Sequence, residues 1–197
     1  MFTYKRIYRG PIKAIIFDLA GTIVDYGSCA PAGVFKELFD KYGIEITNEQ
    51  AREPMGMQKR DHIQKILSMK DVSEKWKQKY RKIWTEEDLD RMYADFIPMQ
   101  ISSLPKYSNL ISGVGEVIEI LRSQGIKIGV TTGYNTEMTN IVIDLIGKQG
   151  VRLDSVVCAS DVPKGRPAPW MIFKTMQELD AFPPESIVSI GDTIPDI

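Results

Sequence analysis

The stretch IKAIIFDLAGTIVD, residues 12–25, joins an apolar run to a turn and decides the fold. Its first part, residues 12–17, is rich in isoleucine, which is typical of a strand buried within a parallel sheet. The run ends at Asp18, and Gly21 and Thr22 then indicate a turn. A carboxylate at the carboxyl end of a parallel strand lies where such sheets bind their ligands. We therefore expect an α/β fold with Asp18 at its functional edge.

Three further segments repeat this pattern and predict three more strands, at residues 126–132, 155–160 and 186–192. Two stretches between them, residues 113–123 and 170–179, carry apolar residues at helical spacing. Strands that alternate with helices form a parallel sheet with right-handed crossovers. We therefore expect a Rossmann-like parallel sheet whose strand ends meet at one edge. The polar residues at these ends are Asp18, Thr131, Thr132, Ser160, Asp161 and Asp192.

The interval between the first two strands is too long for a simple crossover, and its apolar residues follow helical spacing. We expect a helical cap domain over residues 27–105, inserted into an α/β core formed by residues 1–26 and 106–197. Only residues 193–197 follow the fourth strand, although a parallel sheet needs its faces and edges covered. We therefore expect the C-terminal part of the core to be missing and the chain to be a fragment of a longer protein.

The expected cap carries recognisable helix signals. Thr47 and Gln50 form a capping-box pattern, and Pro54 suits the first turn of the next helix. Two amphipathic stretches, residues 73–83 and 85–96, carry several aromatic side chains. Such a stripe is more typical of a packing surface than of a ligand site. These helices therefore form either the cap's own core or an interface with a partner.

The composition argues against several classes of protein. The chain has 197 residues, of which 43% are hydrophobic and 26% charged, and its formal net charge is −1. This charge gives no reason to expect nucleic acid or an anionic membrane as a partner. No apolar run approaches the roughly 20 residues of a membrane-spanning helix. Cys29 and Cys158 are far apart in sequence, which argues against a CxxC metal site or a disulfide framework. We therefore expect a soluble cytoplasmic protein.

The strand ends predict a site for a metal ion and a phosphate group. If Asp18 and Asp192 end neighbouring strands, their carboxylates repel one another, and a hard cation such as Mg²⁺ relieves that repulsion. Oxygen ligands without a nearby histidine or cysteine favour Mg²⁺ over zinc. Backbone N–H groups at glycine-rich turns and a fixed positive charge suit phosphate oxygens. The residues expected to bind phosphate are Gly21, Thr22, Thr132, Gly133 and Arg166.

Four short motifs carry a family resemblance. DLAGT, TTGY, GRPAP and GDTIPD resemble, in this order and at strand ends, the four motifs of the haloacid dehalogenase superfamily. The resemblance implies that Asp18 attacks phosphorus and that water then hydrolyses the aspartyl-phosphate. It also implies that Mg²⁺ is held by Asp18, the carbonyl of Ala20 and Asp192, with Asp196 in an outer shell. Arg166 stands where the superfamily usually has lysine, a change that keeps the charge.

Ala20 departs from the usual pattern of the superfamily. Ordinary phosphatases carry a second aspartate at this place, which protonates the departing alkoxide and then activates the hydrolytic water. A methyl group can do neither. On this feature alone, a degenerate enzyme and an enzyme with a different reaction are both open.

The cap segment PMGMQKRDHI, residues 54–63, favours a different reaction. Met55, Lys59 and His62 stand at relative positions 0, 4 and 7, which places them on one face of a helix. A lysine on an amphipathic helix is usually solvated. Beside an apolar neighbour, however, partial burial lowers the pKa of the amine and makes it nucleophilic. Such an amine condenses with an aldehyde to give an imine, which accepts electrons.

With this segment, nearly the whole chain resembles the family of phosphonoacetaldehyde hydrolases. The resemblance implies that Lys59 forms a Schiff base with phosphonoacetaldehyde while Asp18 attacks phosphorus. The P–C bond then breaks and its electrons pass into the imine, so that no acid is needed in place of Ala20. His62 and Met55 would flank the Schiff base, with His62 as a candidate proton shuttle, and Tyr134 would orient the cap-side groups. Acetaldehyde and phosphate are the implied products, and a homodimer is the implied assembly.

Two other functions stay open at this point. One is an ordinary phosphomonoesterase of the superfamily, against which Ala20 argues. The other is a catalytically inactive member that binds a phosphorylated ligand or a partner protein, which the short C-terminal part favours. The chain also has Leu19 where the family often has tryptophan. Ser28 precedes Cys29 where the family often has cysteine directly after DYG, so a role for the thiol is left open.

Overall fold

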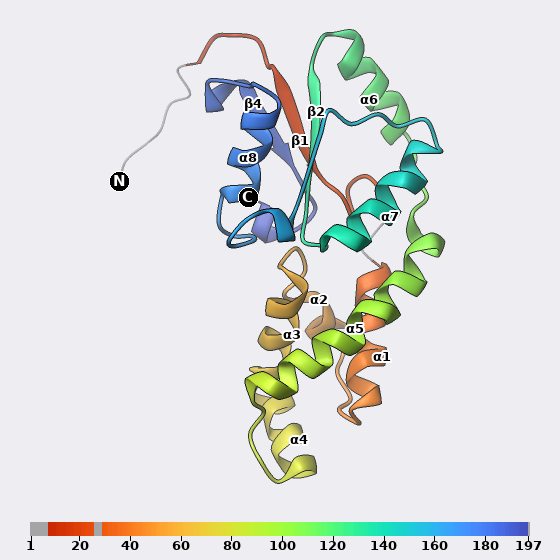
Figure 1. Ribbon diagram of the computed structural model, residues 1–197, viewed down its shortest axis with the longest axis vertical. Coiled ribbons are helices and arrows are strands. Elements are labelled where there is room, and N and C mark those ends of the chain that lie inside the picture. The colour runs from red at the N-terminus through yellow and green to blue at the C-terminus, as the bar shows by residue number, and fades with distance from the viewer. Residues whose placement is uncertain (1–7, 26–28, 197) are drawn as a thin grey trace.

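A parallel sheet forms one end of the molecule in the computed structural model, which describes residues 8–25 and 29–196 (Figure 1). Its strands are β1 (Ala14–Asp18), β2 (Lys127–Thr132), β3 (Ser155–Cys158) and β4 (Ile187–Ile190). Within the described residues they lie in the order β3-β2-β1-β4, and each neighbouring pair is parallel. Asp18 at the end of β1 pairs in register with Thr131 of β2. The parallel α/β sheet expected from the sequence is therefore confirmed.

Helices cover both faces of the sheet (Figure 1). On one side lie α6 (Val114–Ser123) and α7 (Thr136–Gly147), and on the other lies α8 (Trp170–Glu178). α8 packs closely because β2 carries Gly129, where a Cβ would lie 2.5 Å from a methyl carbon of Thr175. Three short 3-10 helices complete the part of the core that the structure describes: η1 (Ala159–Asp161), η2 (Pro184–Ser186) and η3 (Ile194–Asp196).

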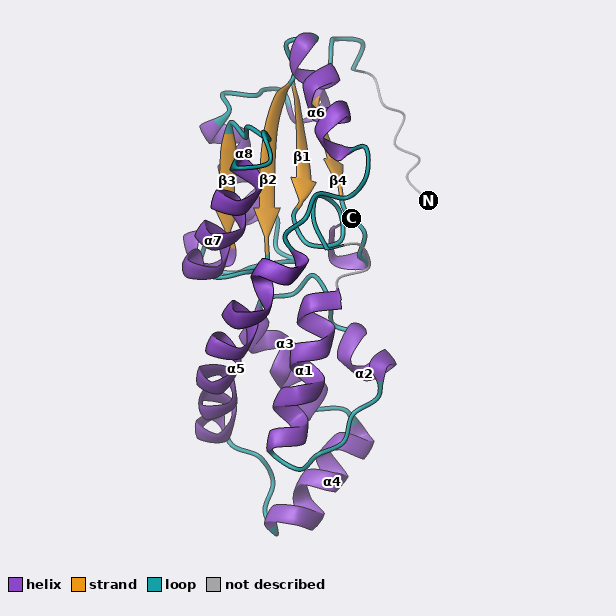
Figure 2. Ribbon diagram, turned by 90° about the vertical axis from the view of Figure 1, so that its right-hand side faces the viewer, coloured by secondary structure: helices purple, strands orange, loops and turns teal. Residues whose placement is uncertain are grey.

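Among the described residues, five helices lie beyond the carboxyl ends of the strands (Figures 1 and 2). They are α1 (Cys29–Lys41), α2 (Asn48–Arg52), α3 (Lys59–Leu67), α4 (Lys70–Tyr80) and α5 (Glu86–Tyr107). Their apolar sides share one core, in which Phe35, Phe39, Trp76 and Phe96 are fully buried. Trp76 and Phe96, aromatic residues of the two amphipathic stretches at 73–83 and 85–96, therefore pack inside the helical layer.

The helix ends follow local chemistry in part. The side chain of Thr47 accepts the N–H of Gln50, whose own side chain accepts the N–H of Thr47, so the expected capping box is confirmed. The expected helix start at Pro54 is wrong. Residues 53–56 form turns, with Gly56 at a φ of +88°, and α3 begins only at Lys59.

Helix α5 is longer than the sequence predicts. The expected helix over residues 85–96 continues to Tyr107, although Pro98 and Pro105 lie inside it. Proline lacks the N–H that bonds to the preceding turn and normally ends or kinks a helix. Burial of Gln100 and Leu104 beyond the first proline keeps the segment helical. No helix among the described residues has both the length and the apolar character needed to span a bilayer.

Candidate active site

A small cavity of about 20 Å³ lies at the carboxyl end of the sheet, where the turn before α3 meets the core. It is just large enough for one water molecule. Eight of the residues that line it are candidates from the sequence: Asp18, Ala20, Met55, Lys59, Thr132, Gly133, Tyr134 and Arg166. The fold therefore brings together side chains from β1, the end of β2, the loop after β3 and the cap segment.

Asp18 is a buried carboxylate at the end of β1. Nη1 of Arg166 donates a hydrogen bond to its Oδ1 at 2.7 Å. Burial raises the pKa of Asp18 to about 6, while the charge of Arg166 lowers it and the nearby charge of Asp196 raises it. Asp18 is thus ionised at neutral pH and held through one carboxylate oxygen.

The guanidinium of Arg166 is shared between several core groups. Its Nη2 donates to the backbone oxygen of Thr131 at 3.1 Å and to the hydroxyl oxygen at 2.6 Å. Its Nε lies 3.0 Å from Oδ1 of Asp196. From the sequence we expected Arg166 to face phosphate oxygens, whereas these contacts place its charge between two carboxylates. Arg166 therefore positions Asp18 and also forms part of the cavity wall.

Three carboxylates form a candidate metal centre. Oxygen atoms of Asp18, Asp192 and Asp196 lie within 4.8 Å of one another. The hydroxyl of Thr22 donates to Asp192 at 3.3 Å, and the backbone N–H of Thr193 donates to Asp196 at 3.0 Å. Burial raises the pKa of Asp192, and the charge of Asp196 raises it further.

The donor set of this centre fits Mg²⁺. All three side chains offer hard carboxylate oxygens, and a single guanidinium, that of Arg166, does not offset three negative charges. The outer-shell place expected for Asp196 stays a prediction. Its carboxylate belongs to the same cluster, which also makes it a candidate for direct coordination.

Lys59 is a buried amine at the first position of α3, with 5% of its surface exposed. Its Nζ lies 5.0 Å from the ring centre of Tyr134 and 5.9 Å from that of Phe35. Burial lowers the pKa of Lys59 to about 8, against the charge of Asp18, which raises it. At that pKa about a tenth of the amine is neutral at pH 7. Lys59 therefore has the properties of an amine nucleophile.

Lys59 and His62 lie one turn apart in α3 and both lie beside Phe35, whereas Met55 does not share their helical face. Met55 lies in the turn before α3 and lines the cavity. His62 lies inside α3 and is fully buried, with its ring stacked on Phe35 at 3.8 Å. The described residues that line the cavity do not include His62.

The surroundings of His62 favour its neutral form. Its Nε2 lies 3.0 Å from the backbone oxygen of Ala51, and its Nδ1 has no hydrogen-bond partner within the described part of the chain. Burial lowers the pKa of His62 well below its usual 6.5, and the charge of Lys59 lowers it further. A role in proton transfer stays a prediction.

The turn after β1 differs from expectation in one respect. The backbone N–H of Gly21 donates to the carbonyl of Val24 at 2.7 Å, so it is already used within the turn. Gly21 has a φ of +100°, and a Cβ there would lie 2.2 Å from Oδ2 of Asp192. The glycine therefore brings the turn against Asp192, and the expectation that its N–H binds phosphate is wrong.

Two lining residues, Gly56 and Thr193, were not predicted from the sequence. Gly56 lies inside the quoted cap segment, and Thr193 directly follows Asp192. Neither residue carries a charge that would mark it in the sequence. Only the contact between the cap segment and the core brings them into the site.

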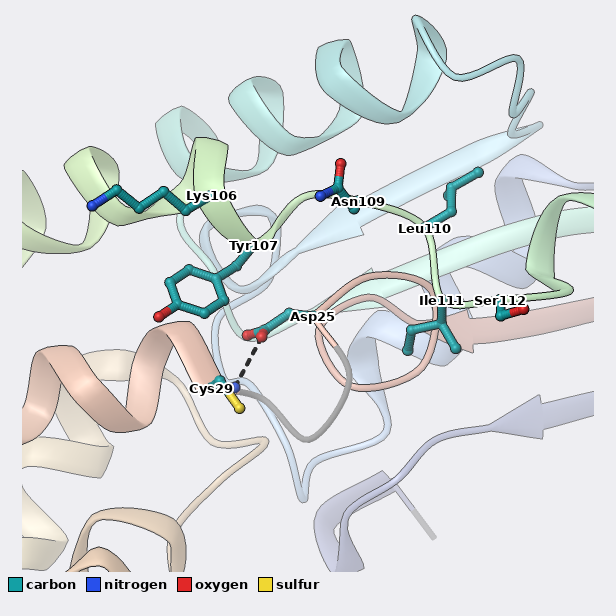
Figure 3. Close-up of a pocket in the computed structure, with 8 residues that line it drawn as sticks. All are labelled: Asp25, Cys29, Lys106, Tyr107, Asn109, Leu110, Ile111 and Ser112. Atoms are coloured by element: carbon teal, nitrogen blue, oxygen red, sulfur yellow. Dashed lines mark hydrogen bonds between the residues drawn. The ribbon is translucent and has the colours of Figure 1, made fainter.

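A larger pocket of about 650 Å³ lies away from these reactive groups, where the chain passes between the sheet and the five helices (Figure 3). Asp25 and Cys29 line it together with the segment from Lys106 to Ser112. The carboxylate of Asp25 accepts the backbone N–H groups of Cys29 and Ala30, each at 2.9 Å. Cys29 is therefore part of this pocket rather than of the cavity beside Lys59.

Comparison with known proteins shows the family to which the chain belongs. Residues 15–197 match the family of haloacid dehalogenase-like hydrolases. The phosphonoacetaldehyde hydrolase of Hahella chejuensis is 45% identical over 196 residues, which are 100% of this chain and 67% of that protein. The crystal structure of a phosphonoacetaldehyde hydrolase-like protein from Oleispira antarctica matches with a TM-score of 0.95 at 38% identity, covering 100% of this chain and 71% of that one.

A relative with two activities is similar as well. The bifunctional phosphonoacetaldehyde hydrolase/aminoethylphosphonate transaminase of Clostridioides difficile is 47% identical over 193 residues. The match covers 98% of this chain but 30% of that protein. The chain thus spans two thirds of the relative from Hahella chejuensis and less than one third of the bifunctional one.

Proposed function

Because the chain belongs to the haloacid dehalogenase-like hydrolases and, within them, to the phosphonoacetaldehyde hydrolases, we propose that it cleaves the carbon–phosphorus bond of phosphonoacetaldehyde. The products are acetaldehyde and phosphate. The observation that carries this proposal is the pairing of Lys59 and Asp18 in one cavity whose wall also contains Ala20. An amine for the aldehyde and a carboxylate for the phosphorus thus line one site.

Lys59 acts first in the proposed reaction. Its neutral amine adds to the aldehyde carbon, and loss of water gives an imine that is protonated at nitrogen. The lowered pKa of Lys59, about 8, supplies the neutral amine, and the rings of Tyr134 and Phe35 exclude water around it. The imine then becomes the acceptor for the electrons of the carbon–phosphorus bond.

Asp18 acts second. Its carboxylate attacks phosphorus, the carbon–phosphorus bond breaks, and the bonding pair passes to the imine as an enamine. Protonation at carbon and hydrolysis release acetaldehyde and regenerate Lys59, while a second water hydrolyses the aspartyl-phosphate. No alkoxide leaves in this sequence, so no acid is required in place of Ala20. The raised pKa of Asp18, about 6, still leaves the carboxylate ionised at neutral pH.

The candidate metal centre supports the attack of Asp18 on phosphorus. Asp18, Asp192 and Asp196 would hold Mg²⁺, with the carbonyl of Ala20 as a further ligand on the family resemblance. The ion would offset the charge of the phosphonate as the carboxylate of Asp18 approaches it. Arg166 keeps Asp18 oriented by its hydrogen bond to Oδ1 and supplies positive charge at the cavity wall.

The cap and the assembly are part of the same proposal. We propose that residues 27–105 form the cap domain and that the protein is a cytoplasmic homodimer, both on the strength of the family. Neither nucleic acid nor a membrane is needed for the reaction. Sedimentation of the purified chain measures the oligomeric state independently of activity.

Product release tests the proposed function. We expect the chain with Mg²⁺ to release phosphate and acetaldehyde in equal amounts from phosphonoacetaldehyde. Lys59→Arg should release neither, because a guanidinium keeps the charge but cannot form the imine. Lys65→Arg is the matched control, since Lys65 is an exposed lysine of the same helix. Faster release of phosphate from p-nitrophenyl phosphate would favour an ordinary phosphomonoesterase instead.

A further inference from the structure

The turn before α3 touches the core through backbone atoms. This cap turn, residues 54–58, carries Met55 and Gly56 into the cavity wall and leads directly into Lys59. On the core side it meets Gly133 after β2, Gly165 before Arg166, and Thr193 in the segment after β4. The position of Lys59 therefore depends on whichever of these contacts are too close to admit a side chain.

At Gly133 this approach leaves no room for a side chain. A Cβ there would lie 2.7 Å from the backbone oxygen of Met57 and 3.2 Å from that of Gly56, whereas ordinary contact begins at 3.4 Å. The backbone of Gly133 is outside the left-handed region, so its own conformation accepts an L-residue. The close approach of the cap turn, rather than local geometry, is therefore what requires glycine at this position.

The opposite side of the cap turn is equally close to the core. Gly56 has a φ of +88°, and a Cβ there would lie 2.4 Å from Oγ1 of Thr193. Thr193 also donates its N–H and hydroxyl to Asp196. At Gly165, in contrast, a Cβ would lie 3.5 Å from that of Gln58, which is ordinary contact. The cap turn thus lies too close to the core for a side chain at Gly133 and at Gly56, and at ordinary contact distance at Gly165.

We propose that Gly133 is a positioning residue, whose missing side chain lets the cap turn close backbone to backbone on the core and so sets Lys59 over Asp18. The role rests on the proposed function, in which these two side chains act on one substrate. Displacing an amine or carboxylate by about 1 Å costs on the order of a hundredfold in turnover. The clash at Gly133 is relieved most easily by lifting the cap turn, because both clashing atoms belong to it.

The contact between the cap turn and the core also sets the surroundings of Lys59. The charges of Asp18 and Arg166 act on it from the core, and that of Asp25 acts from the segment between β1 and α1. The rings of Phe35 and Tyr134 lie near Nζ. Lifting the cap turn separates Lys59 from the core groups and admits water. The pKa of Lys59 then rises from about 8 toward its usual value.

Gly133→Ala tests this role through the chemistry of Lys59 alone. Formaldehyde with dimethylamine-borane methylates neutral accessible amines, and mass spectrometry of the peptide that contains Lys59 gives the rate at that residue. We expect Gly133→Ala to raise the methylation rate that Lys59 reaches at high pH about tenfold, because the site opens. The pH at which methylation is half of this rate should shift upward. Turnover should fall through kcat more than through KM.

Two glycines of the same chain serve as controls. Gly147 ends α7, where a Cβ would meet no atom of the described residues within 4 Å, and Gly165 has only ordinary contacts. Gly147→Ala and Gly165→Ala should therefore leave the methylation rate and midpoint of Lys59 unchanged. An equal change in either control would show a general loosening and contradict the proposal.

Other outcomes are equally decisive. A folded Gly133→Ala protein with the wild-type methylation rate and midpoint would overturn the positioning role. A Gly133→Ala protein that fails to fold would also contradict it, because a cap turn that can lift relieves the clash. Since methylation needs no phosphonate, the expected shift in a chain that does not cleave phosphonoacetaldehyde would keep this inference and remove the proposed function.

Discussion

The amine of Lys59 lies near the rings of Tyr134 and Phe35, and burial lowers its pKa from 10.5 to about 8. Below pH 8 the amine is charged in both the folded and the unfolded chain, so the folded state carries the full cost of burying the charge. As the pH rises from 8 towards 10.5, only the unfolded chain keeps the proton, and this cost falls away. The group that we propose as a nucleophile thus destabilises the fold at neutral pH.

Lys59→Met should therefore be more stable and inactive. At pH 7 we expect the free energy of unfolding to rise by about 2–3 kcal/mol, because the variant no longer buries a charge. The gain should shrink as the pH approaches 10.5. Urea unfolding of both proteins at pH 7 and pH 10 measures it. A variant less stable than the wild type at pH 7 would show that the charge of Lys59 is not destabilising.

The pH dependence of imine formation belongs to the same residue. Only the neutral amine adds to an aldehyde, so trapping of acetaldehyde on Lys59 by cyanoborohydride should rise with pH through a midpoint near 8. The charge of Asp18 raises the pKa of Lys59, so Asp18→Asn should move the midpoint downward. A midpoint near 10.5 in the wild type, or an upward shift in the variant, would contradict the described surroundings of Lys59.

At the scale of elements, Asp25 fixes the start of α1. Its carboxylate accepts the N–H groups of Cys29 and Ala30, and its backbone has a φ of 56°, which is costly for residues other than glycine, asparagine and aspartate. Asp25→Ala loses both hydrogen bonds and takes on the backbone strain. We expect it to lower the free energy of unfolding by about 2–3 kcal/mol.

Asp25→Asn is the matched control for this cap. Its amide oxygen still accepts an N–H and its backbone tolerates the same φ, so we expect less than half of the loss seen for Asp25→Ala. Thermal unfolding followed by circular dichroism compares the two variants. Equal losses would show that the charge of Asp25, rather than its cap and backbone conformation, stabilises α1.

The elements differ in how well the sequence predicts them. Strands β1 to β4 follow from short apolar runs that end in polar residues, and Asp18, Thr132 and Arg166 lie at the edge that this pattern predicts. The sequence does not predict where helix α3 begins, because Gly56 turns the chain so that residues 54–58 lie on the core. Periodicity describes one segment at a time, whereas this turn is decided by a contact with residues far along the chain.

At the scale of the whole molecule, the candidate metal centre joins distant parts of the chain. Asp18 comes from β1, whereas Asp192 and Asp196 come from the segment after β4. An ion bound by all three stabilises the folded chain by an amount that grows with its concentration, about 2.7 kcal/mol at a hundred times its dissociation constant. The segment after β4 also lies against the cap turn at Thr193, so an ion bound there would support this contact.

Removal of the metal should therefore affect stability as well as turnover. We expect EDTA to abolish product release and added Mg²⁺ to restore it and to raise the midpoint of thermal unfolding. In Asp192→Asn the shift with Mg²⁺ should be much smaller, because one of three carboxylate ligands is lost. Differential scanning calorimetry with and without Mg²⁺ gives the midpoints. An identical midpoint for the wild type under both conditions would contradict the proposed centre.

The arrangement of the whole site could be predicted from the sequence only as a set of residues. The motifs name Asp18, Lys59 and Asp192, but their spacing does not reveal that Arg166 bonds to Asp18 or that His62 is buried behind Phe35. Those contacts depend on how the five helices pack and dock on the sheet. The resemblance supplies the expected chemistry, and the packing decides which groups face the cavity.

The identity of the adduct on Lys59 shows whether the carbon–phosphorus bond breaks on an imine of this residue. The chain is incubated with Mg²⁺ and phosphonoacetaldehyde, reduced with borohydride, and the peptide that contains Lys59 is analysed by mass spectrometry. We expect an ethyl group on Lys59 in the wild type, because the carbon–phosphorus bond breaks on the imine. In Asp18→Ala we expect a phosphonoethyl group, because the imine forms but phosphorus is not attacked. Release of phosphate without any adduct on Lys59 would contradict the proposed reaction.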